Sequence, residues 1–277
     1  MAQNDKIKEL AERIKSLSKT DYYKIKIIPN ITPEIFDSKF GGIPYWTPDK
    51  NYPTNSEGKK LILLAQINFD REKVDSPLPT CGMLQFFITD DDIMGVNYEN
   101  PTEQNNFRVI YHETINYNIT KEEIEKLSIP NSNEKTVECF PITKECKISL
   151  NKGVDYIQYG DIHFEDFFPI AYKEIFKEEP KKAITYINIL EENDRNRLDN
   201  ELGVGGSCHK MLGYSFFTQD DPRYVQKYRD YDTTLLQIES EGEYVLWGDC
   251  GVGNFFIHKK SLLEKDFSNV LYNWDCS

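Results

Sequence analysis

Leu235-Leu236-Gln237-Ile238, followed by Trp247-Gly248-Asp249-Cys250-Gly251-Val252-Gly253-Asn254-Phe255-Phe256-Ile257, is the part of the sequence that best predicts the fold. It resembles an earlier part, Leu63-Leu64-Ala65-Gln66-Ile67 followed by Gly82-Met83-Leu84-Gln85-Phe86-Phe87-Ile88. Short apolar runs bounded by turn residues are typical of buried strands. The sequence therefore predicts that one pair of strands occurs twice.

A nearly constant offset in numbering relates the two parts. The offset from Gln66 to Gln237 equals the offset from Gly82 to Gly253. The segment 42–49 (GIPYWTPD) precedes the segment 213–220 (GYSFFTQD) by the same offset. The Phe-Phe-Ile triplets are slightly closer together, which predicts a two-residue deletion just before the last strand of this pair in the second copy. The period is too long for a solenoid or propeller repeat and favours an internal duplication within one body.

Composition agrees with a β-rich globular protein. The chain has 277 residues, enough to bury a substantial core, and 13% of them are aromatic, which favours packing on sheets. We expect an α+β, predominantly antiparallel β fold: a roll-like single body with internal duplication and peripheral helices. The expected organisation is one domain over residues 1–277, with an N-terminal helix at 5–19, a first half at about 39–89, an insert at about 90–203 and a second half at about 208–277.

The formal net charge of −13 restricts the partners. An acidic chain repels phosphate backbones, so nucleic-acid binding is not expected. The same charge would attract a basic protein partner and accelerate the encounter with it. A merely solvated acidic surface explains the charge equally, and the sequence leaves both interpretations open.

Other features point to the cytoplasm. Six cysteines occur without a C-x-x-C pair, and no apolar run follows the N-terminus, so we expect free thiols and neither a zinc site nor a secretory signal. The longest apolar run, 61–65, is too short to span a membrane. The glycine groups at 203–206 and 248–253 lack the flanking strand and helix of a nucleotide-binding loop, so they predict turns, and no cofactor is expected.

Three groups of residues are candidates for ligand binding. Asp221 and Arg223 flank a proline, where the carboxylate either caps a turn or faces a ligand. Gln237 interrupts an apolar strand, so its amide either bonds to nearby loops or lies at the floor of a pocket. Aromatic and polar groups near the last turn are typical of sugar or peptide grooves, and equally of a tightly packed loop. The candidates are Asp221, Arg223, Gln237, Trp247, Asp249 and Asn254.

The sequence resembles a known family in several of these motifs. The segments 39–46, 63–67, 82–87, 219–223 and, above all, 235–276 resemble the YwqG-like family, a bacterial family of unknown function. The resemblance is weakest over about 97–200. It implies a mostly-β, roll-like fold with peripheral helices in a cytosolic bacterial protein. It supplies no catalytic residues, so none is carried over.

Two functional hypotheses remain, beside the possibility of a scaffold without a site. The first is an interaction protein, such as an immunity-like protein that masks a basic toxin; the acidic charge and the lack of a recognisable catalytic constellation favour it. The second is a small-ligand-binding protein or a hydrolase-like enzyme with its site between the two repeated halves. The sequence does not give the reaction, the partner or the oligomeric state, although a non-enzyme is favoured.

Overall fold

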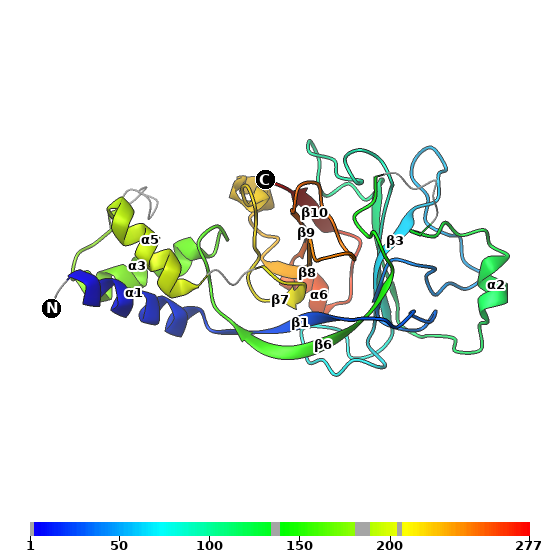
Figure 1. Ribbon diagram of the computed structural model, residues 1–277, viewed down its shortest axis with the longest axis horizontal. Coiled ribbons are helices and arrows are strands. Elements are labelled where there is room, and N and C mark those ends of the chain that lie inside the picture. Colours follow the sequence, from blue (N-terminus) through cyan, green and yellow to red (C-terminus); the bar gives the residue numbers. More distant parts are fainter. Residues whose placement is uncertain (1–2, 134–138, 181–188, 204–206) are drawn as a thin grey trace.

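The computed structural model describes residues 3–133, 139–180, 189–203 and 207–277 (Figure 1). Within them, ten strands form one antiparallel sheet in the order β10-β9-β8-β7-β1-β6-β2-β3-β4-β5. The strands are β1 (Thr20–Ile28), β2 (Lys39–Phe40), β3 (Ile62–Asn68), β4 (Met83–Ile88), β5 (Phe107–His112), β6 (Cys146–Asp155), β7 (Lys210–Leu212), β8 (Thr233–Glu239), β9 (Val252–Ile257) and β10 (Val270–Asp275).

The sheet curls into a nearly closed barrel. Its two outer parts meet through aromatic rings: Phe86 and Phe255 lie 5.0 Å apart, and Phe107 and Tyr272 lie 5.3 Å apart. The backbone N–H of Tyr272 also donates to the carbonyl of Pro101. One continuous apolar core therefore contains side chains from both halves. The predicted α+β, mostly antiparallel fold class is confirmed.

The two outer parts of the sheet match in detail. We call β2–β5 half one and β7–β10 half two; β1 and β6 lie between them. The offset from β3 to β8 is that of the two glutamines, and each strand contains a bulge at the same place, between Leu63 and Ala65 and between Thr234 and Leu236. The offset from β4 to β9 is instead that of the Phe-Phe-Ile triplets. Gly251, which directly precedes β9, is therefore the counterpart of Gly82, and the sequence-based match to Gly253 was wrong.

The interrupting glutamines hold equivalent loops in both halves. The Gln66 side chain accepts from the N–H of Tyr45 at 2.9 Å and donates to the carbonyl of Asp37 at 2.9 Å. Gln237 accepts from the N–H of Phe216 at 2.7 Å and donates to the carbonyl of Cys208 at 2.8 Å. Buried backbone groups away from the strands need such partners, because an unpaired one is costly.

Most predicted elements agree with the structure. The helix expected at 5–19 is α1 (Gln3–Ser18), and Thr120 caps α2 (Lys121–Glu125) in a capping box. The sequence also predicts a helix over 184–202 that ends at a glycine. The structure describes this segment only from residue 189, and it contains α5 (Glu192–Leu202), which ends at Gly203. Most of the glycine group at 203–206, which was expected to form a turn, lies outside the described residues. The segment expected as an insert contributes β5 and β6 to the sheet.

Helices form a separate layer at one end of the molecule (Figure 1). α1, α3 (Phe164–Phe176) and α5 pack on one another around their own apolar cluster. β1 continues from α1 and pairs with β6, so the long central strands connect this layer to the barrel. The short α6 (Lys259–Leu263) joins β9 to β10, and two 3-10 turns, η1 (Pro222–Tyr224) and η2 (Gln226–Tyr228), precede β8. None of the described helices has the length and apolarity needed to cross a membrane.

Candidate functional site

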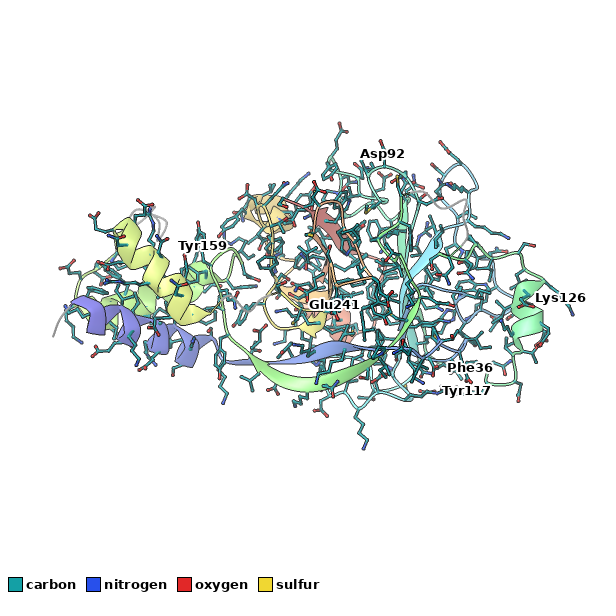
Figure 2. All side chains as sticks on the ribbon, in the orientation of Figure 1. Phe36, Asp92, Tyr117, Lys126, Tyr159 and Glu241 are labelled. Atoms are coloured by element: carbon teal, nitrogen blue, oxygen red, sulfur yellow. The ribbon has the colours of Figure 1, made fainter. Side chains whose placement is uncertain are left out.

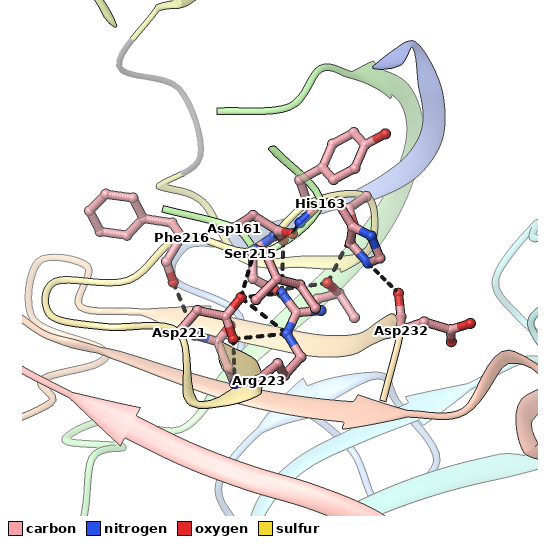
Figure 3. Close-up of polar contacts among 12 residues, drawn as sticks. Asp161, His163, Ser215, Phe216, Asp221, Arg223 and Asp232 are labelled. Atoms are coloured by element: carbon pink, nitrogen blue, oxygen red, sulfur yellow. Dashed lines mark hydrogen bonds and ion pairs between the residues drawn. The ribbon is translucent and has the colours of Figure 1, made fainter. Parts of the chain in front are cut away.

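Arg223 lies between two carboxylates in the interior of half two (Figure 3). Its Nη2 donates to Asp221 at 2.8 Å and to Asp161 at 2.9 Å, and all three side chains are buried. The guanidinium also lies 4.1 Å from the centre of the Phe256 ring. Burial alone would raise the pKa of both carboxyl groups. The neighbouring guanidinium nevertheless lowers the pKa of Asp161 below its ordinary value, whereas burial has the larger effect on Asp221 and its pKa is raised.

The triad contains two carboxylates and only one guanidinium, so backbone N–H groups provide further hydrogen bonds to the carboxylates. The N–H groups of Ser215 and His163 donate to Asp161, and that of Ile162 donates to Asp221 at 3.0 Å. Asp221 also caps η1 by accepting from the N–H of Arg223 at 2.9 Å. The triad thus joins the segment before α3, the loop after β7 and η1. Asp161 was not identified from the sequence, because it lies far along the chain from its partners.

The other four candidates lie in two further places. Gln237 and Asn254 face each other across β8 and β9 and are fully buried. Asn254 donates to the carbonyl of Phe216 at 3.0 Å. Trp247 is fully buried against Gly253, whereas Asp249 is exposed in the turn before β9. The six predicted residues therefore form three separate groups rather than one pocket, and their role in ligand binding stays a prediction.

A cleft of about 360 Å³ lies beside the triad, where the two halves and the helical layer meet. Figure 3 shows two of its residues, His163 and Asp232, next to the triad. The central strands contribute Thr20, Asp21 and Lys152. Half one contributes the loop 75–77, and half two contributes 212–214, 232–233 and Lys259. A volume of this size is within the range that small-molecule sites occupy.

Charged groups of both signs line the cleft. Lys152 lies 3.0 Å from both Asp21 and Asp75, and its hydrogen bond lowers the pKa of Asp75. The Nδ1 atom of His163 lies 3.0 Å from the carboxylate of Asp166, and its Nε2 atom lies 3.2 Å from the backbone carbonyl of Asp232. Across the described chain, no three His, Cys, Asp or Glu side chains gather as a metal site would require. The arrangement suits a polar organic molecule that forms hydrogen bonds and ion pairs.

The cleft floor has a fixed backbone. Leu212 and Gly213 both adopt positive φ angles, of 63° and 73°, and the equivalent residues in half one are Gly41 and Gly42. A Cβ on Gly213 would lie 2.4 Å from a carboxylate oxygen of Asp155, so only glycine fits. A leucine in this conformation carries strain on the order of 1–3 kcal/mol, which the surrounding packing must offset.

Sequence reasoning missed most of the cleft residues for a simple reason. Asp21, Asp75, Lys152 and His163 come from four distant segments, and no local spacing relates them. The match between the halves predicted a site between them, but the cleft is not lined by the residues that were expected there: Asp221, Arg223, Gln237, Trp247, Asp249 and Asn254.

Comparison with known proteins identifies the family. A family model described as "Domain of unknown function (DUF1963)" matches residues 38–276. The match starts next to β2 and ends next to β10, so it includes both halves, whereas the cleft residues Thr20, Asp21 and Tyr23 of β1 lie outside it. No curated protein matches the chain.

Proposed function

Because the chain belongs to the DUF1963 family, whose function is unknown, we propose a function from the geometry of the site. The protein is a binding protein that holds a small, polar, amine-bearing molecule in the cleft between its two halves. The observation that carries this proposal is the cleft of about 360 Å³, to which both halves, the central strands and the helical layer contribute.

The charges in the cleft favour an amine over an anion. Asp21, Asp75 and Asp232 oppose only two lysines, Lys152 and Lys259. Lys152 is already paired with the first two carboxylates, so its charge is partly compensated. The acidity of the whole chain adds a field that attracts cations. Tyr23, Thr20 and Thr233 add hydroxyl groups suited to a ligand with several polar atoms.

A ligand screen tests the proposal. Thermal unfolding is followed with lysine, glucosamine and spermidine as amines, glucose as a neutral control and succinate as an anionic control. An amine that binds the folded state raises the Tm, and the increase grows with the ratio of its concentration to its Kd. Calorimetric titration then gives the Kd of the best amine. The proposal fails if only succinate stabilises the protein, or if no amine does.

A double variant places the ligand. Asp21→Asn with Asp75→Asn removes two exposed carboxylates from the cleft, and the loss of two ion-pair partners is expected to weaken amine binding at least about tenfold. Glu12→Gln with Glu201→Gln removes two exposed carboxylates from α1 and α5 and serves as the matched control. Equal losses in both variants would indicate a general charge effect rather than a site in the cleft.

A second candidate function is interaction with a basic protein, including an immunity-like role against a basic toxin. The net charge of −13 favours it. A hydrolase-like enzyme acting in the cleft is the remaining alternative. Hydrolysis of an amide or ester substrate by the wild-type protein, with no hydrolysis by the Asp21→Asn/Asp75→Asn variant, would favour the enzyme over a simple binding protein.

We also propose that the halves descend from one duplicated unit, and that the protein is a YwqG-like member acting in the bacterial cytoplasm. The shared bulge and the repeated glutamine bonds support the duplication. Ligand binding that is retained in a reducing buffer, together with reaction of all six cysteines as free thiols, would agree with a cytoplasmic location.

A further inference from the structure

Positive charge is missing from three segments of the chain. Residues 83–107 contain Asp90, Asp91, Asp92, Glu99 and Glu103 without a lysine or arginine. Residues 239–257 contain Glu239, Glu241, Glu243 and Asp249, and residues 266–277 contain Asp266 and Asp275, again without a basic side chain.

These segments lie side by side at one edge of the barrel. The indole N–H of Trp274 donates to the carbonyl of Ile93 at 2.7 Å, and the hydroxyl of Tyr272 donates to that of Met94 at 2.8 Å. The hydroxyl of Ser277 donates to the carbonyl of Asp249 at 2.8 Å. Figure 2 shows Asp92 in the loop after β4, at the same upper edge of the molecule as the end of β10. The uneven charge in the sequence thus becomes an uneven charge on the surface.

Apolar side chains are exposed among these carboxylates. Tyr98 is 62% exposed and Ile93 is 38% exposed. Trp274 is partly buried beside them, with its ring 6.1 Å from that of Trp247. Asp92, Glu99 and Asp249 are exposed nearby. We call this surface, consisting of Asp92, Ile93, Tyr98, Glu99, Asp249 and Trp274, the acidic aromatic face.

We propose that the acidic aromatic face docks a basic protein partner through an exposed arginine-rich segment. Guanidinium groups pair with carboxylates and also stack on tyrosine and tryptophan rings, so one residue type satisfies both features of the face. Exposed aromatic residues are also typical of interface anchors. This inference rests on the second candidate function above and is independent of the cleft.

Charge complementarity separates this partner from other occupants. A second copy of the chain would bring the same carboxylates and repel them at low salt. A nucleic acid would be repelled for the same reason. Of the carboxylates around the face, Asp90 is paired with Lys59, and Glu243 is paired with Lys144. Asp92, Glu99 and Asp249 make no ion pair within the described residues, so their charges face a partner uncompensated.

Fluorescence anisotropy with a labelled peptide of alternating arginine and leucine tests the proposal. The face variant Asp92→Asn/Glu99→Gln/Asp249→Asn is compared with a control variant, Glu12→Gln/Glu178→Gln/Glu201→Gln, whose positions are exposed in the helical layer. Both variants lose three charges, so they differ only in where the charges were. The face variant is expected to bind at least about tenfold more weakly, whereas the control stays within about twofold of the wild-type protein.

Further measurements separate the alternatives. Tyr98→Ala is expected to weaken peptide binding several-fold with the charges intact, because it removes the stacking surface. Equal losses in the face and control variants would overturn the proposal in favour of a general charge effect. A dimer in light scattering that the face variant abolishes would overturn it in favour of a second copy. The Asp21→Asn/Asp75→Asn variant should bind the peptide normally, so failure of the cleft and failure of this face remain distinguishable.

Discussion

The two halves share a backbone but differ in the buried side chains that pack on their sheets away from the shared core. Tyr52 of half one lies against Trp46 and Phe87, with ring centres 5.1 and 5.7 Å apart. At the equivalent positions half two has Arg223 over Phe256, with Phe217 beside them. An apolar cluster in one half is therefore replaced in the other by a buried ion triad.

This difference extends to the residue that precedes the first of the long strands in each half. In half one, Leu61 is fully buried in the apolar cluster, which Ile124 of α2 and Ile129 complete. The equivalent residue in half two is Asp232, which is exposed and lines the cleft. The repeated hydrogen bonds hold equivalent loops in both halves, whereas the unmatched polar residue Asp232 lies at the cleft that we propose as the ligand site.

The largest expected effect comes from removing the arginine of the triad. Arg223→Met leaves Asp161 and Asp221 buried without a cation, and we expect a loss of about 3–5 kcal/mol in the free energy of unfolding measured with urea. Tyr52→Met at the equivalent position of half one is the matched control and should cost clearly less. A loss below about 1 kcal/mol for Arg223→Met would contradict the assigned role of the triad.

The matched glutamines should give equal effects. Gln66→Leu and Gln237→Leu each leave buried backbone groups without partners, so each should cost at least about 2 kcal/mol. The double variant should lose the sum of both, because the sites lie in different halves. A strongly unequal pair of losses would show that the two halves are not held in the same way.

The pH dependence of stability should differ between the halves, because different residues end the last strand of each half. His112 of half one is buried, and burial, aided by Lys50, lowers its pKa from 6.5 to about 4. The unfolded chain then binds more protons than the folded protein between these values, so stability falls as the pH drops from 6.5 to 4. The loss from this group is about 2 kcal/mol by pH 5.

The control for this titration is His112→Gln. The equivalent position in half two is Asp275, which accepts from the hydroxyl of Thr218 at 2.7 Å. The variant should lose the His112 contribution to acid sensitivity, although its stability at pH 7 decreases because Gln85 loses a hydrogen-bond partner. An unchanged slope between pH 6.5 and 5 would exclude His112 as the source.

The smallest expected effect concerns the hydroxyl of Tyr52. It is buried and has no hydrogen-bond partner within the described residues. Tyr52→Phe should therefore change the free energy of unfolding by no more than about 0.5 kcal/mol, and a stabilising change is compatible with the loss of an unpaired polar group. A large destabilisation would show that the hydroxyl has a partner, such as a buried water.

The repeat could be predicted from the sequence because its signals are local. Gln66 and Gln237 each interrupt an apolar run, and the offset between them is also the offset between β3 and β8. The match of Gly82 failed because glycine occurs at both 251 and 253, and only strand pairing decides between them. The triad could be predicted only in part, since Asp221 and Arg223 are neighbours whereas Asp161 reaches them through the fold.

A backbone NMR titration with the best-binding amine tests the central claim most directly. If the cleft between the halves is the ligand site, the amide signals of Thr20, Gly213 and Thr233 shift together and saturate at the Kd from calorimetry. The amide signals near Asp249 should not move with them. Shifts confined to the acidic aromatic face, or spread without saturation over the whole surface, would contradict a ligand site in the cleft.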